Sequence, residues 1–310
     1  MNLRRALVAT LILVGCGPEF EKPSLVTGPR VLGIVADPPE VAFSEGTRLE
    51  AVIAFPEKVS SLSWTWCPLS LGASMGYKCA VPEVPNPDSS PTITFDATTL
   101  GTMLEGMRPQ FGQLVPFLRQ TVRQSDVCLR DVIGQWDACN GQSPCADEVF
   151  NAFMGCLHAG GVGVTFHLHL QLEDGTAMEA YKAVLVRDPG PSRNHNPPLS
   201  GVEVTHSIVH KDEVTHSIPG NKLEMKVVPG PGAVEEYTDQ EGNLQKERVF
   251  FTWYTTTGDF EHTRSTPEAP ENTLKLPPER PDEITIWVFA HDDRGGASYV
   301  RFFVHKRLMQ

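Results

Sequence analysis

Six cysteines in the first half of the chain are the residues whose spacing best defines a chemistry. They are Cys67, Cys79, Cys128, Cys139, Cys145 and Cys156. The last four follow the pattern Cys-x10-Cys-x5-Cys-x10-Cys, and about three turns of helix return residues eleven apart to one helix face. Two such helices folded antiparallel would pair Cys139 with Cys145 and Cys128 with Cys156. Counting alone also allows other pairings of these four.

The remaining pair, Cys67 and Cys79, would close a separate loop. A four-cysteine metal site is the alternative for the later cysteines, but zinc sites usually contain closely spaced Cys-x2-4-Cys pairs, which are absent. Disulfides persist mainly in oxidising compartments. We therefore predict three disulfides and a protein that works outside the cytoplasm.

Two histidines on one expected strand could bind a metal ion. The stretch Val162–Leu172 alternates apolar and polar residues, which indicates a strand with one buried face and one wetted face. His167 and His169 both lie on the polar face, and no third ligand can be identified from the sequence. A solvated surface is the favoured interpretation, and the pair is only a weak metal candidate.

A short duplication brings further histidines into consideration. Glu203–Ile208 is repeated without change as Glu213–Ile218, which predicts a hairpin of two like strands. His206 and His216 occupy the same place in the two copies, and His210 lies between them. Their approach in such a hairpin would give a second weak site for a divalent metal.

The remaining polar residues and motifs indicate no catalysed reaction. Asp292 and Asp293 could offer carboxylates to calcium, but no Asp-x-Asp-x-Asp set accompanies them, and turn chemistry explains Asp and Gly there. The chain contains no G-x-S-x-G, no H-E-x-x-H and no phosphate-binding glycine loop. We predict no catalytic residue, no cofactor, no bound metal and a non-enzymatic protein.

The amino terminus has the organisation of an export signal. Arg4 and Arg5 precede a nine-residue apolar stretch at 6–14, far short of the roughly 20 residues that span a bilayer. Leu13-Val14-Gly15-Cys16 resembles the lipobox of bacterial lipoproteins. The resemblance implies that Cys16 becomes the first residue of the mature chain and carries diacylglycerol and an acyl chain such as palmitate, enough lipid for stable anchoring. Gly17, where an aspartate would favour the inner membrane, favours the outer membrane.

Short apolar runs bounded by proline and acidic turns predict β-sandwiches in both halves of the chain. In the first half the expected strands are Val31–Ala36, Arg48–Phe55, Val59–Trp66, Pro91–Phe95, Val162–Leu172 and Met178–Arg187. In the second half they are Leu199–Thr205, Lys222–Val228, Arg248–Thr255, Glu283–His291 and Ala297–His305. Trp64 and Trp66 share a face of their strand, which we expect to point into a core.

These elements define the domain organisation that we expect. A signal peptide at 1–15 and a lipidated tether at 16–29 precede a first β-sandwich domain at 30–188. Apolar residues at helical spacing within 98–159 predict an α-helical insert in that domain, in which Pro109 and Pro116 should keep the helices short. A proline-rich linker at 189–198 leads to a second β-sandwich domain at 199–307.

Several segments resemble a known group of proteins. Leu25–Val41, directly after the lipobox, resembles the opening of myxobacterial-type surface lipoproteins with immunoglobulin-like modules, and Trp64–Cys67 and Arg193–Pro197 are similar to later landmarks of that group. Phe251–Tyr254 and Ile286–Gly296 resemble the core-tryptophan strand and last hairpin of such modules. The resemblance implies two immunoglobulin-like β-sandwiches in tandem and very little about activity.

The net charge of −12 argues against a nucleic-acid partner. We expect a lipid-anchored binding, scaffold or adhesion-type protein of the outer membrane, on its periplasmic or cell-surface side. Its insert either binds an unknown protein or envelope partner or caps a sandwich edge. The alternatives are a carbohydrate- or metal-binding accessory module and, less favoured, a hydrolase of unrecognised type. Glycan binding would need exposed tryptophans, and the five present are Trp64, Trp66, Trp136, Trp253 and Trp287.

Overall fold

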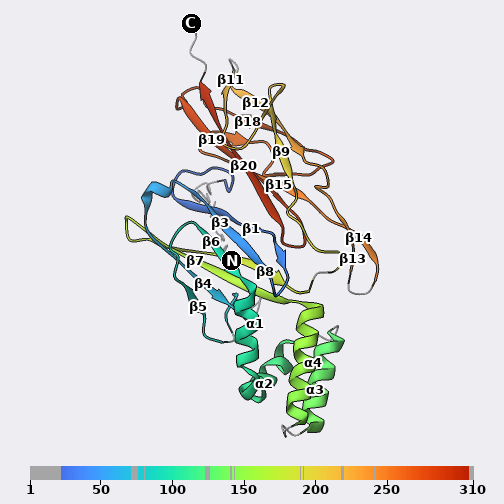
Figure 1. Ribbon diagram of the computed structural model, residues 1–310. Helices are drawn as coiled ribbons and strands as arrows, with labels where there is room; N and C mark the ends of the chain where they lie inside the picture. The colour runs from blue at the N-terminus through green and yellow to red at the C-terminus, as the bar shows by residue number, and fades with distance from the viewer. Residues whose placement is uncertain are drawn as a thin grey trace, which may run out of the picture.

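The computed structural model describes residues 22–306 except 71–75, 80, 123–125, 140–141, 143, 189, 191, 218–219 and 240–241. Two β-sandwiches are packed on one another, and a helical lobe extends from the first (Figure 1). The predicted fold class, mainly β with a helical insert, is confirmed. Cys16 and the export signal lie outside the described residues. Within the described part of the chain, no helix is long and apolar enough to cross a membrane.

The first sandwich consists of two sheets around one apolar core. One sheet has the order β1-β3-β6, with β1 at Arg30–Asp37, β3 at Gly46–Ala54 and β6 at Thr92–Asp96. The other has the order β2-β8-β7-β4-β5, with β2 at Glu40–Val41, β8 at Ala177–Val186, β7 at Val162–Leu172, β4 at Val59–Cys67 and β5 at Val84–Asn86. A short 3-10 helix, η1 (Pro56–Lys58), joins β3 to β4. Trp64 and Trp66 are buried between the sheets, as predicted.

The insert between β6 and β7 is helical. Its elements are α1 (Ala97–Gly106), the 3-10 helix η3 (Arg108–Gln110), α2 (Phe111–Thr121), α3 (Val127–Cys139) and α4 (Cys145–Gly160). α1 begins where the side chain of Asp96 accepts a hydrogen bond from the backbone N–H of Thr98, a common helix cap. Pro109 lies in η3, whereas Pro116 lies inside α2 and does not end it.

Two disulfides fasten α3 to α4. Cys128 pairs with Cys156 and Cys139 with Cys145, which confirms the pairing derived from helical spacing. Phe111 of α2 packs against Phe150 and Phe153 of α4, with ring centroids 5.3 and 5.0 Å apart. This aromatic cluster is continuous with the core of the first sandwich, so the insert and the sandwich share one apolar interior.

The second sandwich follows the same two-sheet plan. One sheet has the order β10-β9-β12-β18-β16, formed by Ser207–Val209, Leu199–Val204, Lys222–Pro229, Glu271–Lys275 and Asp259–Phe260. The other has the order β11-β20-β19-β15-β17, formed by Val214–Ser217, Ala297–Lys306, Glu283–His291, Phe250–Thr255 and Arg264–Ser265. A small ribbon is made of β13 (Glu236–Thr238) and β14 (Leu244–Lys246).

The duplicated hexapeptide does not form the predicted hairpin. The first copy turns back on itself at Thr205 and His206, both at positive φ, so that β10 pairs with β9. The second copy forms β11, which runs parallel to β20 in the opposite sheet. Asp212, between the copies, is held by an ion pair with Arg301 of β20. The hairpin prediction was wrong because long-range pairing with β20 separates the two copies.

The two sandwiches are packed directly on one another. Their contact is a third apolar cluster in which Leu32, Val35, Val52 and Ala54 of the first sandwich meet Trp287, Phe289 and Ala297 of the second. Gly33 lies in this contact, and a Cβ atom there would come within 2.9 Å of the Phe289 ring. The β1–β3 sheet therefore rests on the β19–β20 sheet, and the four sheets form successive layers.

The segments expected as a tether and as a linker both make specific contacts with the sandwiches. In the expected tether, Val26 is buried, its N–H donates to the carbonyl oxygen of Thr255 in β15, and Lys22 forms an ion pair with Asp259 of β16. In the expected linker, the Asn196 side chain donates to the carbonyl oxygen of Ala36 and accepts from the N–H of Ala297. Asn196 thus links the first sandwich to the second.

Candidate functional site

The histidine pair on β7 lies under a covering loop. His167 and His169 project from the sheet face that points away from the core, and in the strand register they lie opposite Tyr181 and Glu179 of β8. Two residues of the connection from β4 to β5, Tyr77 and Glu83, contact this face. Tyr77 stacks on Tyr181 with ring centroids 5.2 Å apart, and the Cys67–Cys79 disulfide joins the connection to the end of β4.

The covering loop adds a carboxylate to the two imidazoles. Glu83 Oε1 lies 2.9 Å from Nδ1 of His167, and Glu83 Oε2 accepts a hydrogen bond of 2.5 Å from the hydroxyl of Thr65 on β4. Glu83, His167 and His169 each offer one ligand atom, and these three atoms lie within 4.8 Å of one another. Two nitrogens and one oxygen from three side chains therefore converge.

The burial of His167 differs from the prediction of a solvated face. The residue is 5 % exposed, and its Nε2 atom has no hydrogen-bond partner among the described residues. Tyr181 stands edge-on to its ring, with centroids 4.6 Å apart. The solvated-surface interpretation is therefore wrong for His167. Period-two alternation shows which face points away from the core, but it carries no information about a loop that covers that face.

A second carboxylate completes the surroundings of the pair. Glu179 Oε1 lies 3.4 Å from Nδ1 of His169, and the hydroxyl of Tyr181 donates a 2.6 Å hydrogen bond to Glu179 Oε2. That hydrogen bond lowers the pKa of Glu179 and raises the pKa of Tyr181, because it favours the carboxylate and the neutral phenol. Glu179 consequently stays ionised beside His169.

The sequence patterns predict no role for Glu83, Thr65, Glu179 or Tyr181. Three of these residues lie on neighbouring strands, where a known register would have placed Thr65, Tyr181 and Glu179 beside the histidines. Glu83 comes from a loop, and no periodic pattern predicts its position.

The other predicted metal candidates do not assemble. His206 lies in the β9–β10 turn with its side chain 95 % exposed, next to Glu203, while His216 of β11 lies in the opposite sheet with its ring 6.1 Å from that of His305. In the part of the chain that the structure describes, neither belongs to a group of three converging metal ligands.

Asp292 and Asp293 are engaged within the last hairpin. Asp292 Oδ1 accepts hydrogen bonds from the backbone N–H groups of Arg294 and Gly296, and Asp293 forms an ion pair of 2.9 Å with Arg248. The two hydrogen bonds to Asp292 Oδ1 are contacts typical of an aspartate in a tight turn.

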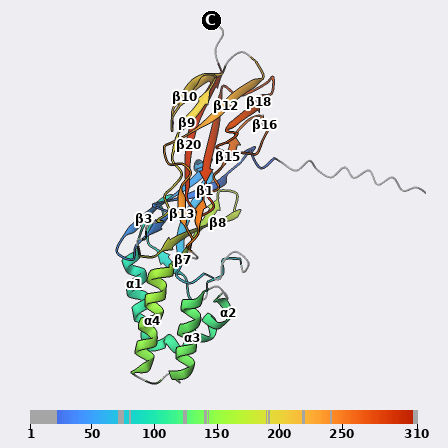
Figure 2. The same cartoon turned by 90° about the vertical axis from the view of Figure 1, so that its right-hand side faces the viewer.

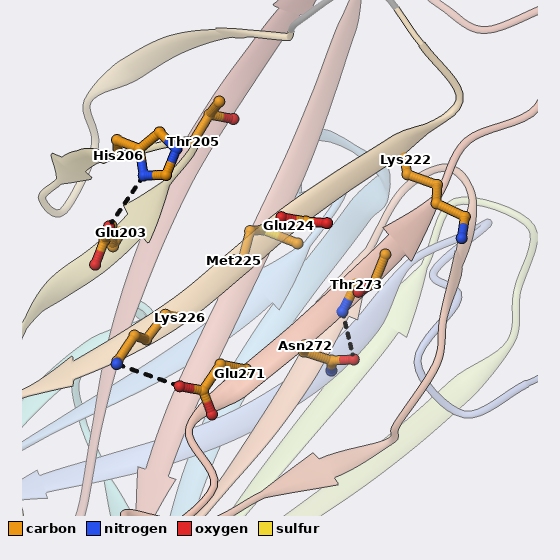
Figure 3. Close-up of a pocket in the computed structure, with 10 residues that line it drawn as sticks. All are labelled: Glu203, Thr205, His206, Lys222, Glu224, Met225, Lys226, Glu271, Asn272 and Thr273. Carbon is orange, nitrogen blue, oxygen red and sulfur yellow. Dashed lines mark hydrogen bonds and ion pairs between the residues drawn. The ribbon is translucent and has the colours of Figure 1, made fainter.

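The outer face of the second sandwich is hollowed over β9, β12 and β18 (Figure 3). The hollow has a volume of about 360 Å³. Lys226 lies 3.2 Å from Glu271, His206 lies 3.8 Å from Glu203, and Lys222 and Glu224 line the hollow as well. Both signs of charge are therefore present, and no Phe, Tyr or Trp ring lines the hollow.

The tryptophans outside the insert offer no exposed ring on which a glycan could stack. Trp64, Trp66, Trp253 and Trp287 are all buried. Trp136 of α3 is partly buried and packs edge-on against Phe111, with centroids 5.3 Å apart. Stacking on a sugar would need an exposed ring face, so the carbohydrate alternative loses its four best residues.

Comparisons with known proteins give only distant structural similarity. No protein-family model matches the chain, and no curated protein matches it. The chain is similar to the N-terminal Ig1-2 module of the Drosophila receptor protein tyrosine phosphatase DLAR, with 7% identity and a TM-score of 0.24 over 90% of this chain and 99% of that one. It is also similar to murine CEACAM1b, with 10% identity and a TM-score of 0.20 over 89% and 100% of the two chains. A third similarity is to Bacteroides ovatus SGBP-B in complex with mixed-linkage heptasaccharide, with 10% identity and a TM-score of 0.22 over 90% and 70%. Scores this low carry no inference about function, and the sandwich architecture rests on the sheets themselves.

Proposed function

We propose that this chain is a non-enzymatic binding protein, anchored by lipid on Cys16 to the outer membrane, that recognises a protein or envelope partner through its helical insert. The observation that carries the proposal is the position of α1–α4. They form a lobe at the end of the first sandwich farthest from the second sandwich, in both views of the molecule (Figures 1 and 2).

The insert has the rigidity that recognition favours. Two disulfides join α3 to α4, and the Phe111 cluster fills the space between the helices. A surface that is already ordered loses less conformational entropy when it binds. The preformed lobe therefore suits recognition without a large folding step.

The exposure of α3 argues against a purely structural cap. Of its residues only Val132 and Cys139 are buried, whereas Arg130, Asp131 and Gln135 are exposed. The helices also extend away from the end of the sandwich instead of lying along a strand edge (Figure 2). A helix that served only to cover an edge would bury one face against that edge.

The start of the described chain supports the orientation that this function needs. Lys22 is held on the second sandwich through Asp259, and Cys16 precedes Lys22 by six residues. Six extended residues reach at most about 20 Å. A lipid on Cys16 would thus hold the second sandwich near the membrane and leave the insert at the far end.

Site-specific crosslinking tests the role of the insert. Deletion of residues 98–159 would be ambiguous, because Leu100 and Leu104 belong to the core that the insert shares with the sandwich. A photoreactive residue at exposed Gln135 of α3 should instead trap a discrete partner in intact cells, and the same residue at exposed Glu224 of β12 is the matched control. Equal crosslinking from both positions, or none from Gln135, would defeat the proposal.

Anchoring is tested separately. Cys16→Ser should abolish incorporation of labelled fatty acid and release the protein from the membrane fraction. Retention of the variant in membranes would contradict a lipid anchor at this residue.

A further inference from the structure

We propose that Glu83, His167 and His169 bind one divalent transition-metal ion of the zinc class. The inference is independent of the role of the insert, since this site lies on the opposite side of the β7 backbone from the shared core. It joins β7 to the loop that covers it.

The donor atoms are close to the arrangement that zinc requires. Bonds of about 2.0–2.2 Å from a tetrahedral zinc ion place neighbouring ligand atoms roughly 3.3 Å apart. Here the three donor atoms lie within 4.8 Å of one another, and His167 Nδ1 is 2.9 Å from Glu83 Oε1. Small rotations of the partly exposed Glu83 and His169 side chains would close the set.

His167 is the most buried of the three proposed ligands. Its side chain is 6 % exposed, and Nε2 has no partner among the described residues. Buried polar atoms in native proteins nearly always have a hydrogen-bond partner. Neutral imidazole binds a metal ion through one ring nitrogen, and Nδ1 is the nitrogen that lies beside Glu83, so an ion held together with Glu83 would bind Nδ1 and not the unpartnered Nε2. Tyr181 packs edge-on against the same ring, which restricts the rotation of His167.

Two of the three ligands, His169 and Glu83, also have a partner that orients them. Glu179 lies beside Nδ1 of His169, while Nε2 of the same ring lies 3.4 Å from the Thr65 hydroxyl, on the side of Glu83. Thr65 in turn donates to Glu83. A carboxylate behind a ligand histidine fixes its tautomer and raises its basicity, as in many metal sites.

Charge and donor type together indicate the class of ion. The carboxylates of Glu83 and Glu179 flank the two imidazoles, so a dication would meet compensating charge. Two nitrogen donors favour zinc, nickel or copper over calcium and magnesium, which prefer oxygen. Because Glu83 and His169 have side chains 33 and 38 % exposed, an ion can reach the site from solvent.

Metal titration of the intact protein tests the proposal. The full untagged lipoprotein, purified in detergent and stripped with a chelator, should bind one zinc ion per chain in competition with a chromogenic indicator. His169→Ala and Glu83→Gln should each weaken binding by at least about 100-fold, beyond the 10- to 100-fold effect of losing an outer-shell partner. Calcium should not compete.

The control is another histidine paired with a carboxylate on a strand. His305 of β20 lies 2.9 Å from Glu283 with a side chain 40 % exposed, without a third ligand among the described residues. His305→Ala should leave zinc affinity unchanged. Zinc should also raise the melting temperature of the parent protein and of His305→Ala, but not of His169→Ala. Absence of stoichiometric zinc binding, or parental affinity in both ligand variants, would overturn the proposal.

Discussion

Arg187 holds the carboxylate of Glu40 through two hydrogen bonds, 2.6 Å from Nε and 3.1 Å from Nη2, at a position where Glu40 is 2 % exposed. The backbone N–H of Asn194 also donates to this carboxylate, and the guanidinium of Arg193 donates to the Glu40 carbonyl oxygen. Arg193 and Asn194 belong to the segment that joins the two sandwiches. One buried acidic residue thus fixes the start of the connection.

Removal of the negative charge of Glu40 should destabilise the protein strongly. Glu40→Gln removes a buried counterion from Arg187. Breaking a fully buried pair typically destabilises by about 3–5 kcal/mol, which is the upper limit here because the Arg187 side chain is 21 % exposed. Glu45→Gln is the matched control, because Glu45 is also paired with an arginine of the connection but its side chain is 39 % exposed, and a surface pair contributes at most about 1 kcal/mol. Urea denaturation measures both, and equal losses would contradict the importance of the buried pair.

The contact between the sandwiches should be sensitive to one methyl group. Gly33→Ala places a Cβ atom 2.9 Å from the ring of Phe289, and overpacking of this kind destabilises by about 1–3 kcal/mol. Gly28→Ala is the control, since no atom lies within 4 Å of the added group. Thermal unfolding should show a lowered transition for Gly33→Ala alone. An unchanged transition temperature for Gly33→Ala would contradict tight packing at this contact.

The stability of the second sandwich should depend on pH through His291. Burial, together with the nearby charges of Lys182 and Arg264, lowers the pKa of His291 to about 4. Between pH 4 and the unfolded value of 6.5 the unfolded chain therefore binds a proton that the folded chain does not, so stability rises with pH in this window. The slope from this group is at most about 1.4 kcal/mol per pH unit.

Substitution tests this assignment. His291→Gln should flatten the dependence of unfolding free energy on pH between 4 and 6.5. The parent protein, measured over the same pH series, is the reference. Burial lowers the pKa of Lys182 to about 8, so this lysine titrates above the window. Identical profiles for His291→Gln and the parent would refute the role of His291.

The two disulfides of the insert should contribute unequally. Cys128–Cys156 closes a loop of sequence separation 28, and Cys139–Cys145 a loop of separation 6. The loop-entropy model assigns about 3–4 kcal/mol to the first and about 2 kcal/mol to the second. Paired Cys→Ser replacements followed by denaturation would measure this difference, and a larger loss from the short loop would contradict the model here.

Local patterns in the sequence determined most of the elements and the cross-links of the insert. Strand alternation placed Trp64 and Trp66 in a core, and the eleven-residue spacing of cysteines predicted two joined helices, because both features depend on the geometry of a single element. The same patterns were less informative for short edge strands such as β16 and β17, which have two residues each. Such short strands form only because other strands lie beside them, and no local pattern predicts which strands these are.

Only the tertiary structure decided which distant residues meet. Glu83 reaches His167 because the connection from β4 to β5, joined to β4 by a disulfide, contacts β7, and the second hexapeptide copy pairs with β20 although its sequence equals that of the first. Lys22 lies on the second sandwich, 237 positions from its partner Asp259. Identical local sequences share the same intrinsic preferences, so the choice between such arrangements comes from long-range burial and strand pairing, which the whole chain satisfies together.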